Sequence, residues 1–225
     1  EASSTMGLRD IIQGLEKAAE DEDVEGIYMN LEGAAAAPST MLDLRNAIGR
    51  FQESGKWIIG WGEMATMGGM YLTSSADELY LHPNGYADFS GMRLQTTYFT
   101  GMLDKIGVGM TVLRGPDNEF KSAVEPFTRK SMSAANRKQM TALMEGIWSQ
   151  TSGAIAEGRG VDESSLDEIA ENIALRTAED AVEWELFDGL LYEDELKERI
   201  KERLDGEEPI YVDFSEYLNP GGMEG

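Results

Sequence analysis

The chain has 225 residues, 41% of them hydrophobic, which suffices for a full core in one large or two small domains. Its 42 acidic residues outnumber 19 basic ones, and the net charge of −23 argues against nucleic-acid binding, which requires Lys and Arg to neutralise phosphates. The chain also offers no basic patch to an anionic membrane surface. The absence of cysteine excludes disulfides, thiol catalysis and thiolate metal sites. The acidic excess indicates either a solvated surface or adaptation to high salt, where ions screen self-repulsion.

Hydrophobic periodicity and the placement of Gly and Pro predict the secondary structure. The predicted helices are, in chain order, 8–19, 39–54, 96–106, 133–157, 164–170, 178–186 and 193–204. The predicted strands are 26–31, 57–61, 79–81, 110–113 and 210–214. Gly68-Gly69 indicates a tight strand-to-helix turn, and Pro83-Asn84-Gly85 indicates a turn after the third strand. No apolar run approaches the ~20 residues that a membrane-spanning helix needs.

Strands and helices alternate through the first half of the chain, and helices dominate after about residue 130. This order predicts an α/β fold with parallel strands, followed by a helical extension. We expect an α/β core over residues 1–130, a helical extension over 131–208, and a terminal strand with a linker over 209–225.

Several common chemistries lack their residues. His82 is the one histidine, and no Gly-x-Ser-x-Gly elbow supplies a nucleophile for it, so a histidine in a turn is the better interpretation. A zinc site needs several His or Cys ligands, and we expect no metal. Gly60-Trp61-Gly62 lacks the third glycine of a dinucleotide fingerprint, and no phosphate loop occurs, so we expect no cofactor.

Lys121 is the candidate catalytic residue, because it stands between Phe120 and the small apolar pair Ala123-Val124. Apolar surroundings disfavour the ammonium form and lower the pKa of a lysine. A neutral lysine can take the proton of a serine hydroxyl, as in Ser-Lys variants of the catalytic triad. The alternative from local composition is a lysine whose stem lies on Phe120 while its ammonium group stays in water.

The segment Phe120–Phe127 resembles the lysine-bearing motif of the signal peptide peptidase A family, also called protease IV or peptidase family S49. Other segments resemble the same family in the same order, so that the similarity covers nearly the whole chain. They are Leu8–Ile11, Glu53–Lys56, Met102–Val108, Met132–Arg137 and Leu186–Leu190.

The resemblance is to the amino-terminal half of the long, two-half form of this family, and it implies a Clp-protease/crotonase-like fold. In that form the amino-terminal half provides the lysine base, here Lys121, and the carboxyl-terminal half provides a serine that precedes Gly-Gly. In this chain Met67 precedes Gly68-Gly69, and a thioether cannot accept an acyl group. The loop that carries glycines in the active half is here Ala34–Ala37, where close backbone approach to an oxyanion is less favoured. Both departures predict a half that lends a base and has no complete site of its own.

The resemblance further implies a membrane-associated serine endopeptidase that degrades cleaved signal peptides on the periplasmic side of the inner membrane. Its implied partners are the peptide substrate, a carboxyl-terminal half and further copies in a homo-oligomer. Because the sequence begins at Glu1 and lacks the strand expected before Leu8, we expect a membrane anchor upstream, and a second half after about Pro220.

Three alternatives remain open. Ser122 is a rival nucleophile, although adjacent side chains on an extended segment point to opposite faces. The chain is alternatively a non-catalytic scaffold for assembly and substrate binding. A third alternative is a crotonase-type enzyme acting on acyl-CoA thioesters, for which the lysine motif has no role.

Overall fold

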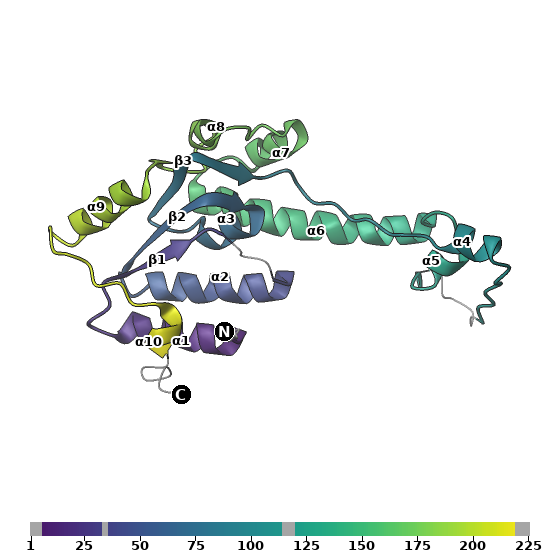
Figure 1. Cartoon of the computed structure of the whole chain (residues 1–225), viewed down its shortest axis with the longest axis horizontal. Helices are drawn as coiled ribbons and strands as arrows, with labels where there is room; N and C mark the ends of the chain where they lie inside the picture. The colour runs from purple at the N-terminus through teal and green to yellow at the C-terminus, as the bar shows by residue number, and fades with distance from the viewer. Residues whose placement is uncertain (1–5, 33–35, 114–119, 219–225) are drawn as a thin grey trace. The chain divides into compact units, whose positions relative to one another are not determined.

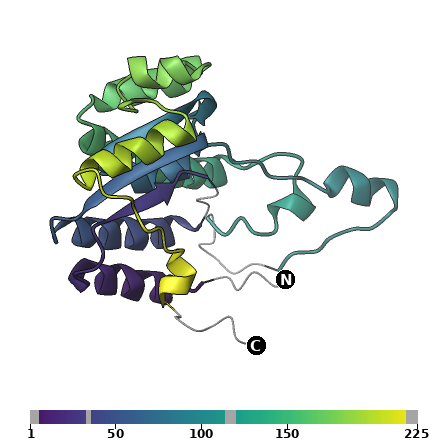
Figure 2. The ribbon, with the colours of Figure 1, turned by 60° about the vertical axis from the view of Figure 1, so that its left-hand side comes forward.

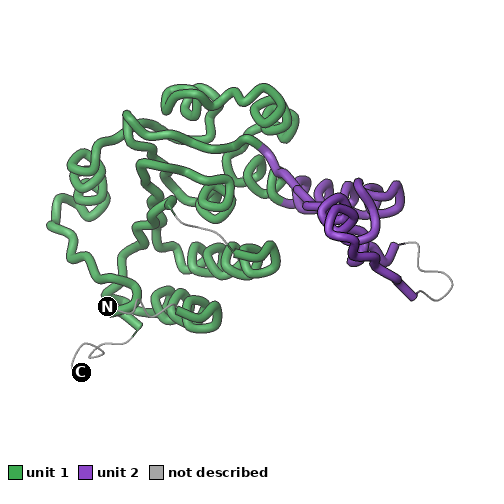
Figure 3. The backbone as a smooth tube through the Cα atoms, turned by 45° about the vertical axis from the view of Figure 1, so that its right-hand side comes forward, with its two compact units in different colours: residues 1–90, 151–225 green, residues 91–150 purple. Residues whose placement is uncertain are grey.

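The computed structural model describes residues 6–32, 36–113 and 120–218 (Figure 1). The chain forms two compact units, one made of residues 1–90 and 151–225 and the other of residues 91–150 (Figure 3). We call them the sheet unit and the lysine unit. The domain boundaries predicted near residues 130 and 208 differ in kind from the borders of these two units, and they stay a prediction.

The sheet unit is built on four parallel strands in the order β1-β2-β3-β4. The strands are β1 Gly26–Asn30, β2 Trp57–Thr66, β3 Glu78–Asp88 and β4 Gly189–Leu190. Gly26 pairs with Trp57, and a Cβ at Gly26 would lie 2.1 Å from the Trp57 ring, so glycine makes room for that ring. The parallel sheet confirms the predicted α/β class. β4 is a short strand that the sequence did not predict.

Helices cover both faces of this sheet (Figure 2). The helices of this unit are α1 Leu8–Glu20, α2 Pro38–Gln52, α3 Met67–Thr73, α7 Glu163–Asn172, α8 Ala178–Glu183, α9 Glu193–Arg203, α10 Phe214–Leu218 and the last part of α6 Ala134–Arg159. Among them, α1 packs on α2 and α10 packs on α1. α9 lies across one face, where its Leu196 and Ile200 form a buried cluster with Ile59 and Trp61 of β2. Each such fully buried side chain contributes roughly 1.5–3 kcal/mol through removal of apolar area from water.

β2 and β3 are longer than predicted, because the Pro83-Asn84-Gly85 turn signal is a bulge inside β3. Gly62 pairs with Leu81 and Met64 pairs with Tyr86, so Glu63 alone faces the four residues 82–85. A Cβ at Gly85 would lie 2.5 Å from the Glu63 carbonyl oxygen. His82 stabilises the bulge, since its Nδ1 accepts a hydrogen bond of 3.0 Å from the Asn84 amide. The interpretation of His82 as a structural histidine agrees with this contact.

Two predicted strands are wrong. Residues 110–113 have no regular structure, and Met110 and Leu113 are exposed, because no strand within the described ranges lies beside them to accept their backbone hydrogen bonds. Residues 210–213 are also irregular, and α10 begins at Phe214. The Asp213 carboxylate accepts from the Ser215 amide at 2.8 Å and caps that helix, which ends the apolar alternation.

The lysine unit contains α4 Thr100–Lys105, α5 Glu125–Thr128 and the first part of α6. α4 is shorter than the predicted helix 96–106, whereas α6 matches the predicted helix 133–157 closely. Among the described residues of 91–150, the buried ones are Glu125 and Asn136, both polar. The described part of this unit therefore has a hydrogen-bonded centre in place of an apolar core.

Candidate active site

The lysine segment is a turn that leads into a short helix. Phe120, Lys121 and Ser122 precede a turn at Ala123-Val124, and α5 follows directly. The Glu125 amide donates to the Ser122 carbonyl at 2.9 Å, so the first hydrogen bond of the turn closes one residue after Lys121.

Three contacts hold α5 beside the start of α4. The Phe99 amide donates to the Pro126 carbonyl at 2.7 Å, and the Thr100 hydroxyl donates to the Arg129 carbonyl at 2.5 Å. The rings of Phe99 and Phe127 stack with their centroids 5.7 Å apart. The backbone that follows the lysine is thus fixed by neighbours from outside its own turn.

Glu125 connects the same turn to α6. Its Oε2 accepts hydrogen bonds of 3.1 Å from the Ser133 amide and from Nδ2 of Asn136. Burial alone would raise the pKa of Glu125, but the hydrogen bonds from Ser133 and Asn136 and the nearby Arg129 guanidinium outweigh it and lower that pKa below its ordinary value. Glu125 is therefore ionised near neutral pH. Its carboxylate is bonded to residues at the start of α6, and no ion pair joins it to Lys121 among the described residues, as the requirement for a neutral lysine predicts.

Lys121 itself is exposed, and Phe120 is 52% exposed. The expectation that neighbours within this chain bury the lysine is wrong for the chain as described. The reason is that the described part of the lysine unit buries no apolar side chain on which Lys121 could pack. Desolvation of its amine requires a surface from outside the described residues.

The Gly68-Gly69 turn lies in the sheet unit, where β2 passes directly into α3, as predicted. Thr66 caps α3, since its Oγ1 accepts from the Gly69 amide at 3.1 Å. A Cβ at Gly69 would lie 2.3 Å from the Leu31 carbonyl oxygen, so only glycine fits. Met67 occupies the position between the cap and the glycines. The first two residues of the predicted loop Ala34–Ala37 lie outside the described residues.

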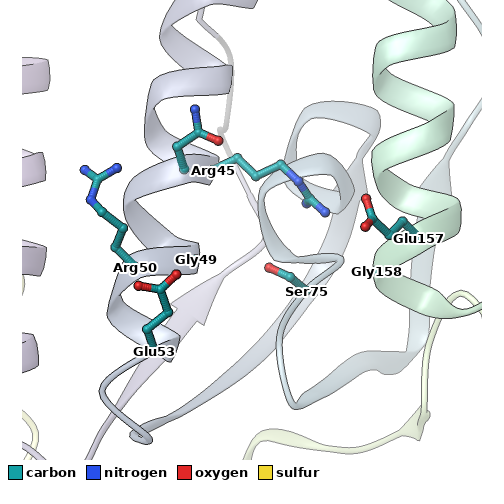
Figure 4. Close-up of a pocket in the computed structure, with 8 residues that line it drawn as sticks. Arg45, Gly49, Arg50, Glu53, Ser75, Glu157 and Gly158 are labelled. Carbon is teal, nitrogen blue, oxygen red and sulfur yellow. The ribbon is translucent and has the colours of Figure 1, made fainter.

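A cavity of about 440 Å³ lies in the sheet unit between α2, the loop after α3 and the end of α6 (Figure 4). Its lining is Arg45, Asn46, Gly49, Arg50, Glu53, Ser75, Glu157 and Gly158. Arg45 donates to the carbonyls of Tyr71 and Ala154 and to the Ser74 hydroxyl. The charges of two arginines and two glutamates cancel in this lining. The hydrogen bonds of Arg45 link α2 to the end of α3 and to α6. The lining therefore carries no net charge, and it contains no His or Lys that could act as a base for the hydroxyl of Ser75.

Asn136 is the site residue that the sequence analysis missed. The spacing Ser133-x-x-Asn136 carries a signal, because Ser at a helix start accepts from the amide three residues on. The structure has this bond, from the Asn136 amide to the Ser133 Oγ at 3.1 Å.

Among the described residues, no group of three or more His, Asp or Glu side chains is arranged to hold a metal ion. No helix within the described ranges is long and apolar enough to cross a membrane.

Comparison with known proteins places this geometry in a family. Residues 50–206 match the description "Peptidase family S49". The chain is 25% identical to the chloroplastic serine protease SPPA of Arabidopsis thaliana over 222 residues, which are 99% of this chain and 32% of that protein. It is 32% identical to Protease 4 of Haemophilus influenzae over 158 residues, 70% of this chain and 25% of the relative.

Protease 4 of Salmonella typhi is 31% identical over 160 residues, 71% of this chain and 26% of the relative. The chain thus spans about a quarter to a third of the length of these relatives. The matched residues 50–206 include β2, β3, β4 and the whole lysine unit. The chain belongs to peptidase family S49, and its parallel sheet covered by helices is the α/β arrangement that the Clp-protease/crotonase-like fold of this family implies.

Proposed function

We propose that this chain is the amino-terminal half of a two-half serine endopeptidase that degrades cleaved signal peptides, and that Lys121 is its general base. The observation that carries the proposal is that Lys121 is exposed while the backbone after it is held in place. An exposed amine stands at the start of a turn whose backbone is bonded to both α4 and Glu125. Met67 before Gly68-Gly69 supports a serine that comes from another segment. We further propose that the complete enzyme is membrane-associated and works on the periplasmic side of the inner membrane.

The proposed reaction uses Lys121 twice. The neutral Nζ takes the proton of the serine hydroxyl while the serine oxygen attacks the peptide carbonyl carbon. The resulting ammonium then donates that proton to the amine of the cleaved bond, which leaves as the first product, and an acyl-enzyme ester remains. Water, deprotonated by the same lysine, then attacks the ester carbonyl carbon. The ammonium returns the proton to the departing serine oxygen, and the second product leaves as a carboxylic acid. A neutral lysine requires desolvation, which a docked second half would provide at the exposed Phe120 and Lys121.

The test is substitution of the lysine in the complete enzyme. Lys121→Ala should lower kcat for a peptide substrate by roughly a hundredfold or more, which is the usual contribution of a general base. Lys121→Arg should be equally inactive, because a guanidinium does not give up its proton near neutral pH. Lys138→Ala, at an exposed position on α6 of the same unit, is the matched control and should keep full activity. Hydrolysis retained by both Lys121 variants would refute the assignment.

A second candidate function, as an assembly scaffold, is favoured by the exposed apolar side chains of the lysine unit. They are Leu94, Phe99, Met102, Ile106, Val108, Met110, Leu113, Phe120, Phe127 and Leu143. Contiguous apolar surface on a protein marks an interaction site more often than chance. Solution mass distinguishes the possibilities, since a chain that stays monomeric at high concentration would weaken the scaffold function and leave the proposed base untouched.

A further inference from the structure

The centre of the lysine unit is a pair of polar side chains, Glu125 and Asn136. Their residues are 4% and 7% exposed, lower than any other described residue of 91–150. Buried carboxylates are rare unless they are bonded, and this one accepts two hydrogen bonds on a single oxygen. The most buried part of the described unit is therefore the hydrogen-bond network around the Glu125 carboxylate, four residues after Lys121.

This network is closed on itself. Glu125 Oε2 accepts from the Ser133 amide and from Asn136 Nδ2, and the Asn136 amide donates to the Ser133 Oγ. On its other side the Glu125 amide donates to the Ser122 carbonyl. One residue thus joins the end of the lysine turn to the cap of α6, and the backbone at residues 122–125 follows the position of the cap.

The arrangement is not the one that stability alone selects. The Asn136 Oδ1 is buried and has no hydrogen-bond partner among the described residues. An unsatisfied buried acceptor is unfavourable, and an apolar pair of similar volume would avoid it. Costly polar contacts of this kind concentrate at functional sites, where precise placement matters more than stability.

We infer that Glu125 is a positioning residue for the proposed base Lys121, holding the lysine turn on the cap of α6 as a hydrogen-bond acceptor and not as a counter-charge for the lysine. The inference rests on the proposed function. The inference implies that an uncharged hydrogen-bond acceptor at position 125 would also hold the lysine turn on the cap of α6. A carboxylate that stabilised the ammonium form of Lys121 would act against a base that must be neutral.

The experiment compares Glu125→Ala with Glu125→Gln in the complete enzyme. Glu125→Ala removes the acceptor, and kcat should fall roughly a hundredfold with KM little changed, because a small displacement of a catalytic group costs about that much. Glu125→Gln keeps one acceptor oxygen and removes the charge, and it should rescue most of kcat without moving the pH–rate profile. Asn136→Ala, which removes one of the two donors, should give a smaller loss in the same direction. Glu145→Ala, an exposed acid on α6, is the matched control.

Hydrogen exchange on the 225-residue chain provides a readout that does not depend on activity. In Glu125→Ala the amides of residues 122–133 should exchange faster, while those of β2 keep their wild-type protection and report an intact sheet. Unchanged exchange at 122–133 would overturn the inference, as would wild-type kcat in Glu125→Ala. A Glu125→Gln variant as impaired as Glu125→Ala, or one with a shifted pH profile, would show that the charge is what matters and would also overturn it.

Lys121→Ala in the same assay separates the two claims. If Lys121→Ala is inactive while Glu125→Ala is fully active, only the positioning role fails. If Lys121→Ala is active, the proposed base fails, and with it the function of the turn that Glu125 holds.

Discussion

At the scale of single residues, Gly69 is a position where a backbone atom blocks any added side chain. A Cβ there would lie 2.3 Å from the Leu31 carbonyl oxygen, which is backbone and cannot rotate away. Gly69→Ala should therefore lower the free energy of unfolding by about 1–3 kcal/mol, the usual cost of overpacking. Urea denaturation of the purified chain measures it.

Gly49 supplies the matched control for that prediction. It lies in α2 of the same unit, and a Cβ there would meet nothing within 4 Å. Gly49→Ala should leave stability unchanged or raise it by up to about 1 kcal/mol, because alanine favours the helix. Equal effects of the two substitutions would mean that the strand-to-helix turn relaxes freely.

The sequence motif marks Lys121 as the candidate base, an assignment that stays a proposal, but the surroundings of this lysine were not predictable. Local composition left open a lysine among apolar groups and a lysine whose ammonium group stays in water, and the exposed Lys121 corresponds to the second. Burial is a property of tertiary packing, and the described part of the lysine unit buries no apolar side chain. Glu125 was expected to point away from Lys121, and its carboxylate is bonded to Ser133 and Asn136, partners that depend on how α6 begins.

At the scale of elements, α10 is held on α1 by polar contacts that one substitution can test. The Tyr217 hydroxyl donates to Asp21 Oδ2 at 2.8 Å, and Lys17 Nζ lies 4.2 Å from the centroid of the Tyr217 ring. Burial, together with the bond to Asp21, raises the pKa of Tyr217 to about 12. The proton of this hydroxyl is therefore retained more firmly in the folded chain than in the unfolded one.

Tyr217→Phe should lower the free energy of unfolding by about 1 kcal/mol near neutral pH, the typical net value of a hydrogen bond. Because the folded pKa is raised, the contribution is full below the unfolded value of about 10 and is lost as the pH rises through about 12. The difference between wild type and variant should narrow over that window, as followed by denaturation at a series of pH values. Tyr86→Phe, at an exposed position, is the matched control for loss of a tyrosine hydroxyl.

Elements whose signals are local were predictable, and elements that depend on distant partners were not. β1, β2 and α6 follow from apolar runs and helical periodicity, and their observed bounds lie close to the predicted ones, apart from the longer carboxyl end of β2. β4 is two residues long and exists because Tyr80 and Leu81 of β3 lie beside it. The same dependence explains why the strand predicted at 110–113 does not form, since no described strand lies beside that apolar run.

At the scale of the whole molecule, the net charge of −23 should make stability depend on salt. Self-repulsion opposes the compact state, and at about 1 M salt the Debye length falls to about 3 Å. Adding NaCl to about that level at neutral pH should raise Tm, with each kcal/mol of relieved repulsion worth about 2–4 °C in a chain of this size.

The control for the salt prediction is the same titration near the isoelectric point of about 4.3, where net charge vanishes. The salt dependence of Tm should largely disappear there. An equal rise at both pH values would assign the effect to preferential exclusion of salt from the surface, and the acidic composition would then be a matter of solubility alone.

The order in which the two units use the chain has a consequence for how such proteases diversify. The polypeptide leaves the sheet after residue 90 and re-enters the same scaffold at residue 151. The stretch that carries Lys121 is thus an inserted excursion, and insertions at such points are generally tolerated. Substitutions within that stretch can therefore change the surroundings of the proposed base while the strands of the sheet stay the same.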